Sequence, residues 1–460
     1  MPQIADLVVR NARLVATMDA SRRELAGGWV AVTGGLVSAV GAATDPAPPA
    51  STVIDATDCL VTPGLVNTHH HLYQNLTRAF PPMTSAPLFG WLQSLYPLWR
   101  DLDEEAAYVS AWIGLAELAL SGCTTSTDHL YVHPAGGGDL LSAEISAARD
   151  LGMRFHPTRG SMNLSVKDGG LPPDEVVQDH DTILAASEEA VARHHDRSHG
   201  AMVRIALAPC SPFSVTKALL EETAVLAERL DVRLHTHLAE NDEDDSYSIE
   251  KFGCRPVEYF DEVGWCTDRS WVAHCVKPNP EEVVRLGRAG VGVAHCPSSN
   301  LILSSGIAPV AAMRSAGVPV GLGVDGSSSA DAASLWLEAR TALLVGKLLT
   351  GAASMSARDC LDIATRGGAQ CLGRSGEIGE LSVGSTGDIA IWSLSSVQFA
   401  GVIADPIEGW LRCGPTAART TIVHGKVVVD DGRLLSSKLE TMLRDHTRIA
   451  TAMQSGRNHA

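Results

Sequence analysis

Histidine, glutamate and aspartate side chains follow four apolar segments that lie far apart in the sequence. The segments are PGLVNTHHH (residues 63–71), LHTHLAE (234–240), VAHC (272–275) and GLGVDG (321–326). Each apolar run stops abruptly at histidine or aspartate, which is typical of a buried parallel strand whose C-terminal end opens into an active site. Histidine and carboxylate side chains gathered at such strand ends predict metal-assisted hydrolysis.

Four of these residues have the types that bind a single divalent metal ion. His69 and His71 are two positions apart, so their side chains share one face of a strand. His237 adds a third imidazole, and Asp325 adds a carboxylate. An isolated HxH pair is more often a polar loop or a satisfied core histidine, but chance does not readily place such residues at four strand ends. Three neutral nitrogens, one carboxylate and an open position for water suit Zn²⁺ or Fe²⁺, and we expect one ion, with Zn²⁺ preferred.

Two further residues have the chemistry for the proton transfers. Glu240 lies three residues after His237, where it could take a proton from the nucleophilic water and give it to the leaving nitrogen. Its alternative role is a solvated carboxylate in the acidic run ENDEDD (240–245). His274 ends the next strand and is predicted to hydrogen-bond the attacking hydroxide or the developing oxyanion, with a structural histidine as the alternative. We expect Asp325 to accept a proton as the tetrahedral intermediate collapses.

Five side chains are candidates for binding the substrate. They are Gln74, Trp91, His129, Arg159 and His295. The Gln74 amide can pair with a lactam edge, and the Trp91 indole can cover a planar ring. Trp91 belongs to WLQSLYPLW (91–99), which also fits an amphipathic packing segment, and His129 and Arg159 also fit ordinary loop hydrogen-bond donors. The sequence leaves both interpretations open.

Strand and helix patterns alternate through the middle of the chain. Apolar runs such as MVRIALAPC (202–210) are separated by helical patterns of roughly 10–15 residues, and Gly122 and Gly152 mark helix ends. This alternation predicts an α/β protein with a (β/α)8 TIM barrel over residues 59–374. A doubly wound open sheet is the alternative, but functional residues end many strands here instead of clustering at one switch point.

The two ends of the chain have strand patterns instead. Residues 1–58 and 375–440 show alternating apolar runs with turns such as Gly34-Gly35. Because neither end is large enough to bury a good core alone, we expect both to pack together into one small β-sandwich domain. Residues 441–460 are predicted to form a C-terminal helical tail.

The composition excludes several classes of partner. The 460 residues include 53 acidic and 36 basic side chains, and the formal net charge of -17 repels nucleic acid and anionic membrane surfaces. No apolar stretch is long enough to span a bilayer, and the N-terminal residues resemble neither a signal peptide nor an anchor. Ten cysteines without a CxxC pair favour a reducing cytoplasm. We expect a small heterocyclic substrate, and a homo-oligomer is compatible with the sequence.

The motifs resemble those of the amidohydrolase superfamily, and within it the mononuclear aminohydrolase branch, over nearly the whole chain. In that branch, the metal ligands are an HxH pair on the first strand, a histidine on the fifth and an aspartate on the eighth. The matching residues are His69, His71, His237 and Asp325 for the metal, with Glu240 and His274 for the acid/base and the sixth-strand histidine. The binuclear branches use a carboxylated lysine on the fourth strand, and RIALAPCSPFS (204–214) has none, which argues against a dihydroorotase or hydantoinase.

Longer segments are similar to the bacterial deaminases of 8-oxoguanine, with aminotriazine hydrolases as near relatives. These segments include HHHLYQNLTRAFP (69–81), LFGWLQSLYPLW (88–99) and RIALAPCSPFSVT (204–216). The resemblance implies hydrolytic removal of the C2 amino group of 8-oxoguanine, which gives urate and ammonia. The alternatives are a triazine aminohydrolase or chlorohydrolase, a guanine or isoxanthopterin deaminase, and a noncatalytic barrel scaffold. The scaffold is least favoured because the ligands and the acid/base are all present.

One loop departs from the pattern of these relatives. They commonly carry Asn-Asp in a GSASND-like loop after the eighth-strand motif, whereas this chain reads GSSSAD (326–331), with Ala330 before Asp331. The loop is expected to border the substrate pocket.

Overall fold

Eight parallel strands form a closed barrel in the middle of the chain. The computed structural model describes residues 4–455. Around the barrel the order is β10-β11-β12-β13-β14-β15-β16-β8, so the last strand pairs with the first. The strands are β8 (Leu65–Asn67), β10 (Cys123–Leu130), β11 (Arg154–Ser161), β12 (Ala206–Pro209), β13 (Leu234–Leu238), β14 (Ser270–His274), β15 (Gly292–His295) and β16 (Val320–Leu322). The predicted (β/α)8 barrel is confirmed, and the open sheet is excluded.

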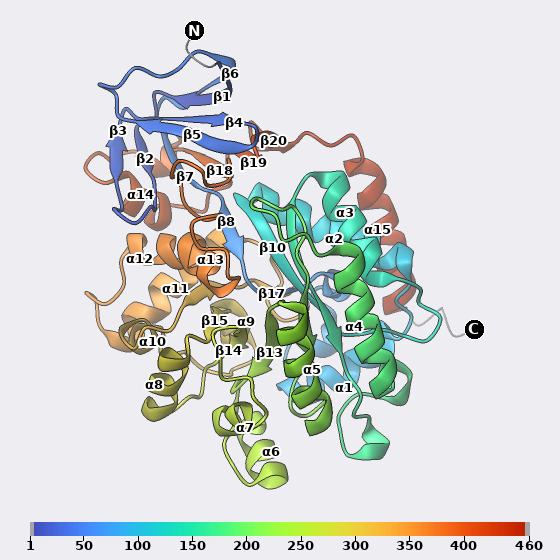
Figure 1. The fold of residues 1–460 in the computed structure, drawn as a ribbon. Coiled ribbons are helices and arrows are strands. Elements are labelled where there is room, and N and C mark those ends of the chain that lie inside the picture. Colours follow the sequence, from blue (N-terminus) through green and yellow to red (C-terminus); the bar gives the residue numbers. More distant parts are fainter. Residues whose placement is uncertain (1–3, 456–460) are drawn as a thin grey trace.

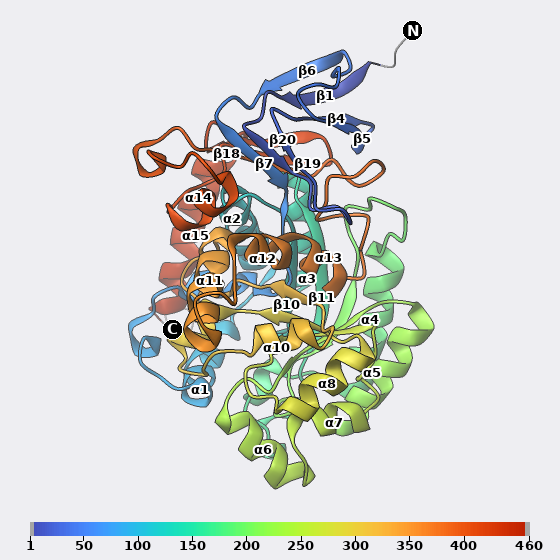
Figure 2. The same cartoon turned by 90° about the vertical axis from the view of Figure 1, so that its left-hand side faces the viewer.

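Helices surround the barrel on its outer side (Figures 1 and 2). They include α2 (Glu104–Leu120), α3 (Leu140–Leu151), α4 (His180–His194), α5 (Lys217–Leu230), α7 (Pro256–Glu262), α8 (Pro280–Ala289), α10 (Val310–Ser315), α11 (Leu335–Thr350), α12 (Ala357–Asp362) and α13 (Gly368–Cys371). Local sequence sets their ends: the Asp103 carboxylate accepts a hydrogen bond from the Ala106 N–H at the start of α2. Gly152 ends α3 with a φ of 82°, a left-handed conformation that favours glycine.

Two shorter helices extend from the C-terminal ends of the barrel strands. The helix α1 (Leu88–Trp99) lies between β9 (His70–His71) and α2, and α6 (Asp242–Phe252) follows β13. The Phe89 N–H donates a hydrogen bond to the Glu243 carboxylate, which links the two helices. They therefore lie at the same end of the barrel as the predicted chemistry.

Strands from both ends of the chain form two further sheets. The first has the order β5-β4-β1-β6, and the second β21-β20-β19-β18-β7-β2-β3. Their strands are β1 (Ala5–Arg10), β2 (Leu14–Ala16), β3 (Glu24–Ala26), β4 (Trp29–Thr33), β5 (Leu36–Gly41), β6 (Ala50–Asp55), β7 (Cys59–Pro63), β18 (Ile389–Ser393), β19 (Thr420–Val423), β20 (Lys426–Asp430) and β21 (Arg433–Leu434). Val9 and Val30 of the first sheet share an apolar core with Val15, Val61 and Ile389 of the second.

The chain passes directly from these sheets into the barrel. The strand β7 lies within the range predicted for the barrel, yet it pairs with β2 and β18, and Gly64 alone separates it from β8. At the start of β11, the Arg154 guanidinium donates two hydrogen bonds to the buried Asp388 carboxylate, at 3.1 and 3.2 Å. The two sheets therefore cover the end of the barrel where its strands begin (Figure 1).

A C-terminal helix, α15 (Leu439–Gln454), packs against α2 and the short helix η1 (Leu72–Thr77). Its His446 Nε2 lies 2.8 Å from the Asn75 side-chain oxygen, and the Gln454 amide donates to the Leu76 carbonyl. The last residues predicted for this tail, 456–460, lie outside the described part of the chain. The helix α15 therefore packs against η1, the segment that directly follows His71, and stabilises its position.

The structure also describes two features discussed from the composition: the apolarity of the helices and the state of the cysteines. None of the helices in the described part of the chain is long and apolar enough to cross a membrane. All ten cysteines are free thiols. The cytoplasmic location and a homo-oligomeric state stay predictions.

Candidate active site

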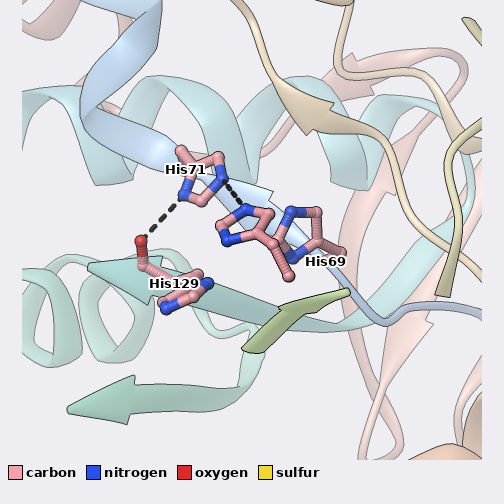
Figure 3. A group of neighbouring side chains, drawn as sticks. His69, His71 and His129 are labelled. Carbon is pink, nitrogen blue, oxygen red and sulfur yellow. Dashed lines mark hydrogen bonds between the residues drawn. The ribbon is translucent and has the colours of Figure 1, made fainter. Parts of the chain in front are cut away.

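The predicted metal ligands meet at the C-terminal ends of the barrel strands. His69 and His71 follow β8, His237 lies in β13, and Asp325 begins β17 (Asp325–Gly326), which pairs with β9. Figure 3 shows His69 and His71 side by side, with His129 of the next strand beneath them. Segments separated by about 250 residues thus supply one cluster because all parallel strands end at the same side of the barrel.

The spacing of the donor atoms fits a metal ion. His69 Nε2 and His71 Nε2 lie 3.3 and 3.4 Å from Asp325 Oδ1, and His71 Nε2 lies 3.2 Å from His237 Nε2. Four ligands placed tetrahedrally about 2.05 Å from one ion would lie roughly 3.3 Å from one another. His69 Nε2 is buried and has no hydrogen-bond partner among the described residues. The donor set therefore fits a small divalent cation.

Backbone carbonyls fix the tautomers of two of these histidines. His71 Nδ1 lies 2.8 Å from the His129 carbonyl, and His237 Nδ1 lies 2.7 Å from the Cys210 carbonyl. A carbonyl can only accept, so each Nδ1 must carry the proton. Each Nε2 is then left with a free lone pair directed at the cluster, which is the form that binds a metal.

A side chain performs the same task for His69. His69 Nδ1 lies 2.8 Å from His235 Nε2, and His235 Nδ1 lies 2.9 Å from the Trp271 carbonyl. The carbonyl requires a proton on His235 Nδ1, so His235 Nε2 accepts the proton of His69 and leaves His69 Nε2 free. Our sequence analysis missed His235, although LHTH repeats the HxH spacing that singled out His69 and His71.

Asp325 is held in a strained and highly polar position. Its backbone has a φ of 58°, which is uncommon for a non-glycine residue. The Ser299 and Ser329 hydroxyls donate hydrogen bonds to Oδ2 at 2.5 and 3.1 Å, which leaves Oδ1 facing His69 and His71. Burial favours the neutral carboxyl, but the neighbouring histidines outweigh it and hold the Asp325 pKa well below its usual value.

Glu240 and His274 lie beside this cluster. His274 Nε2 is 3.7 Å from Glu240 Oε2 and 4.0 Å from Asp325 Oδ2, while His274 Nδ1 is 3.0 Å from the Asn300 side-chain oxygen. Burial raises the Glu240 pKa above its usual value, which makes the carboxylate a stronger base toward a nearby water. Burial opposes the charge on His274, but the two carboxylates outweigh it and raise the His274 pKa.

A cavity of about 380 Å³ opens onto these groups. Its polar end contains His71, His237, Glu240, His274 and Asp325, and its walls include Leu88, Trp91, Leu92, Phe213 and Leu303. The cavity therefore suits a compact molecule with one polar edge and flat apolar faces.

Two of the predicted substrate residues line this cavity. The Trp91 indole N–H donates to the Ser328 carbonyl at 3.2 Å, which fixes the ring in the wall. Gln74 Oε1 is buried without a hydrogen-bond partner among the described residues. A Cβ atom on Gly326 would lie 1.7 Å from this oxygen, so only glycine at position 326 admits the amide. The GSSSAD loop thus holds Asp325, Trp91 and Gln74 together.

The other three predicted substrate residues do not line the cavity. His129 lies deeper in the barrel, where its ring stacks on His237 at 4.9 Å and its Nε2 lies 3.0 Å from the Ala208 carbonyl. Arg159 faces a different hollow between α3 and α4, because it pairs in register with Leu130 and not with the inward-facing His129. His295 borders a small cavity toward α10 and α11. His129, Arg159 and His295 are thus absent from the cavity lining, and their contact with a substrate stays a prediction.

A barrel with metal-binding donors and a buried carboxylic acid at the C-terminal ends of its strands defines a class of metal-assisted hydrolase. The amidohydrolase family model matches residues 60–428, and the chain belongs to this family. It is a hydrolase that acts on C–N bonds. The chain is 46% identical over 448 residues to 8-oxoguanine deaminase from Pseudomonas aeruginosa, which covers 97% of this chain and 99% of that protein.

Two other relatives extend the comparison. Isoxanthopterin deaminase from an unknown prokaryotic organism is 37% identical over 453 residues, with 92% of both chains covered. The crystal structure of atrazine chlorohydrolase from Arthrobacter aurescens TC1, complexed with zinc, superposes with a TM-score of 0.92 at 33% identity, covering 96% of this chain and all of that one. The noncatalytic scaffold therefore has no support among these relatives.

Proposed function

We propose that this protein is a hydrolytic deaminase that converts 8-oxoguanine and water to urate and ammonia. The observation that carries the proposal is the 46% identity to a deaminase of that substrate over nearly the full length of both chains. Relatives of lower identity act, by their names, on isoxanthopterin and on triazines, which are also flat nitrogen heterocycles. Hydrolytic removal of a ring substituent is therefore common to these relatives, and deamination of 8-oxoguanine is the finer part of the proposal.

The cavity supports a free base as the substrate. The small cavity lined by the Trp91 and Phe213 rings suits a single bicyclic ring better than a base with an attached sugar. Aromatic walls stack well on a planar heterocycle. The unpartnered Gln74 amide oxygen offers an acceptor for a ring N–H, which a substrate that lacks that donor would leave unsatisfied.

The ligand role of His69, His71, His237 and Asp325 is part of the proposal. One ion, with Zn²⁺ preferred over Fe²⁺, fits three imidazole nitrogens and one carboxylate oxygen. A divalent ion in such a site acts as a Lewis acid and lowers the pKa of water. The protein holds the three histidines as Nε2 donors through His129, Cys210 and His235 and keeps the site within a small cavity.

The remaining residues move the protons. We assign Glu240 to remove a proton from the water that attacks C2 and to deliver it to the departing amino nitrogen, so that the C2–O bond forms and the C2–N bond breaks. His274, positioned by Asn300, donates a hydrogen bond to the oxygen that becomes negative at C2. Asp325 lies 4.0 Å from His274 and accepts the remaining proton as the amine leaves.

A substrate screen tests the proposal. Ammonia release is measured for 8-oxoguanine, guanine, isoxanthopterin, isocytosine, cytosine and an aminotriazine with the purified metal-loaded enzyme. We expect the highest kcat/KM for 8-oxoguanine. Release of chloride or an alkylamine from a triazine, without ammonia from any purine, would assign the protein to the triazine hydrolases instead.

A further inference from the structure

A second hollow lies at the opposite end of the barrel from the metal site and has a very different lining. It is open to solvent, with about 660 Å³ of empty space counted up to its mouth, and its charged and imidazole residues are Arg197, Arg204, Arg233, Arg269, His156 and His195, with Asp231. Arg204, Arg233 and Arg269 precede β12, β13 and β14, whereas the metal ligands and Glu240 lie at or beyond the other ends of the strands. Arg233 precedes His237 by four positions, which corresponds to roughly 13 Å along an extended strand.

The positive charge of this hollow is only partly balanced. Asp231 lies 3.1 Å from Arg269 and 3.9 Å from Arg197. Glu377 lies 2.9 Å from Arg204 and also pairs with the buried Arg374.

Asp268 adds a third carboxylate, which acts on Arg233 through space. The four lining arginines and the adjacent Arg374 thus lie near three carboxylates, an excess of two positive charges in a chain whose net charge is -17. The hollow is therefore a local site of positive potential on an acidic protein.

Arg233 is the least satisfied of these arginines. Its guanidinium makes no hydrogen bond or ion pair with any described residue, and its Nε is buried. Burial lowers the Arg233 pKa to about 10, so the group is still charged at neutral pH. A Cβ atom on Gly373 would lie 2.7 Å from Arg233 Nη1, so glycine at position 373 leaves the space that the guanidinium occupies. A largely buried charge without a partner is costly, and an anionic ligand would relieve that cost.

The two histidines add polar groups without adding much charge. His156 is buried among Arg204, Arg233 and Arg374, and burial together with these cations holds its pKa well below the usual value. His195 Nδ1 lies 3.1 Å from the Ile205 carbonyl, which sets the ring orientation at the wall. The arginines alone therefore supply the positive charge for an anion.

We propose that this hollow is a binding site for a small molecule that carries a phosphate or diphosphate group. Planar guanidinium groups pair with phosphate oxygens through two parallel hydrogen bonds, and Arg197, Arg233 and Arg269 converge on the same space. A dianion matches the excess of two positive charges. The volume exceeds the needs of a single phosphate group and accommodates a diphosphate or a compact organic phosphate.

Binding of inorganic pyrophosphate to the metal-loaded enzyme tests this site. Isothermal titration calorimetry is performed in 0.15 M salt, which screens weak surface attraction, on the wild type, Arg233→Gln, Arg197→Gln and Arg229→Gln. Arg197 is largely exposed, so its variant folds even if Arg233→Gln does not. Arg229 is an exposed arginine of α5 that pairs with Glu188 outside the hollow, and it is the matched control.

We expect saturable binding to the wild type and Arg229→Gln, weakened about tenfold or more by Arg233→Gln and by Arg197→Gln, because each removes charge-assisted hydrogen bonds. Pyrophosphate also coordinates metal ions and could bind at the active site. The comparison between variants therefore decides whether it binds in the arginine-lined hollow. Absent binding to the wild type, or equal binding to all four proteins, would overturn the proposal. Titrations with inorganic phosphate, AMP and adenosine then separate a free phosphate from an organic phosphate, and adenosine is expected not to bind.

Discussion

At the scale of single residues, the site separates metal binding from proton transfer. His69, His71, His237 and Asp325 converge within 3.2–3.4 Å between donor atoms, whereas Glu240 lies beside them against His274. Replacing a residue that only transfers protons should leave the metal bound. Replacing a residue that orients a metal ligand should weaken metal binding. The two residue predictions below depend on this distinction.

Replacing Glu240 with glutamine removes the acid/base group and keeps its size. We expect turnover to fall by roughly a hundredfold or more, because a positioned acid/base group contributes about that much and this one serves two proton transfers. Metal content and unfolding temperature are expected to stay near wild type. Steady-state kinetics and metal analysis of the same sample check both parts, and unchanged turnover would transfer the proton shuttle to His274.

Replacing His235 with alanine removes the acceptor that fixes the His69 tautomer. The wild type is expected to hold about one equivalent of metal per chain. We expect the replacement to lower the metal affinity about 10–100-fold, since the loss of a hydrogen-bond partner of a ligand histidine has an effect of this size. His235→Gln should recover part of the affinity because its amide oxygen can accept from His69 Nδ1. Competition with a chelator measures the affinity; wild-type affinity in His235→Ala would show that the contact is dispensable.

At the scale of elements, short segments rather than strands shape the substrate cavity. The helix η1 carries Gln74, α1 carries Trp91, and the loop after Asp325 contacts both through Ser328. On its outer side, η1 rests against α15 through Asn75 and Leu76. The position of the Gln74 amide thus depends on the close approach of Gly326.

Gly326→Ala tests this arrangement. The added methyl group would displace the Gln74 amide, so we expect kcat/KM to fall by about tenfold or more, since small misplacements of binding groups are costly in active sites. Gly90→Ala in α1 is the control, because a Cβ atom there meets only atoms 3.9 Å away. Kinetics on both variants decide the matter, and equal kcat/KM values would remove Gln74 from the binding site.

Strand alternation explains which site residues were predictable from the sequence. His69, His71 and His237 end apolar runs. All parallel strands of a barrel end at the same side, so these residues come together independently of the lengths of the loops between them. Whether a residue within a strand faces inward depends on the register, and the sequence could not show that Arg159 pairs with Leu130 while its neighbour Thr158 pairs with His129. Trp91 and Gln74, which lie outside the barrel strands, were identified only through resemblance and chemical type.

At the scale of the whole molecule, the two ends of the barrel differ. The metal cluster occupies the C-terminal ends of the strands, and the two β-sheets built from both ends of the chain cover the other end. Alternating strand and helix patterns made the barrel predictable, and short alternating runs indicated the additional sheets. The contact between these parts was not predictable, since Arg154 and Asp388 are 234 residues apart and neither belongs to a motif.

Asp388→Ala is expected to destabilise the protein by about 3–5 kcal/mol, because it leaves the buried Arg154 charge without its partner. Glu105→Ala is the control: Glu105 pairs with Arg448 on the surface, where loss of a pair costs about 1 kcal/mol or less. Urea unfolding followed by circular dichroism gives both free energies. Equal values for the two variants would show that the Arg154–Asp388 pair does not join the sheets to the barrel.

The central claim is the substrate, and its most direct test compares 8-oxoguanine with guanine on the same metal-loaded enzyme. The two bases differ at C8 and at the neighbouring N7, away from the amino group that leaves, so a difference in kcat/KM reports recognition and not the chemistry at C2. We predict a kcat/KM at least a hundredfold higher for 8-oxoguanine, with one urate and one ammonia formed for each base consumed. Guanine hydrolysed as well as or better than 8-oxoguanine would contradict the claim.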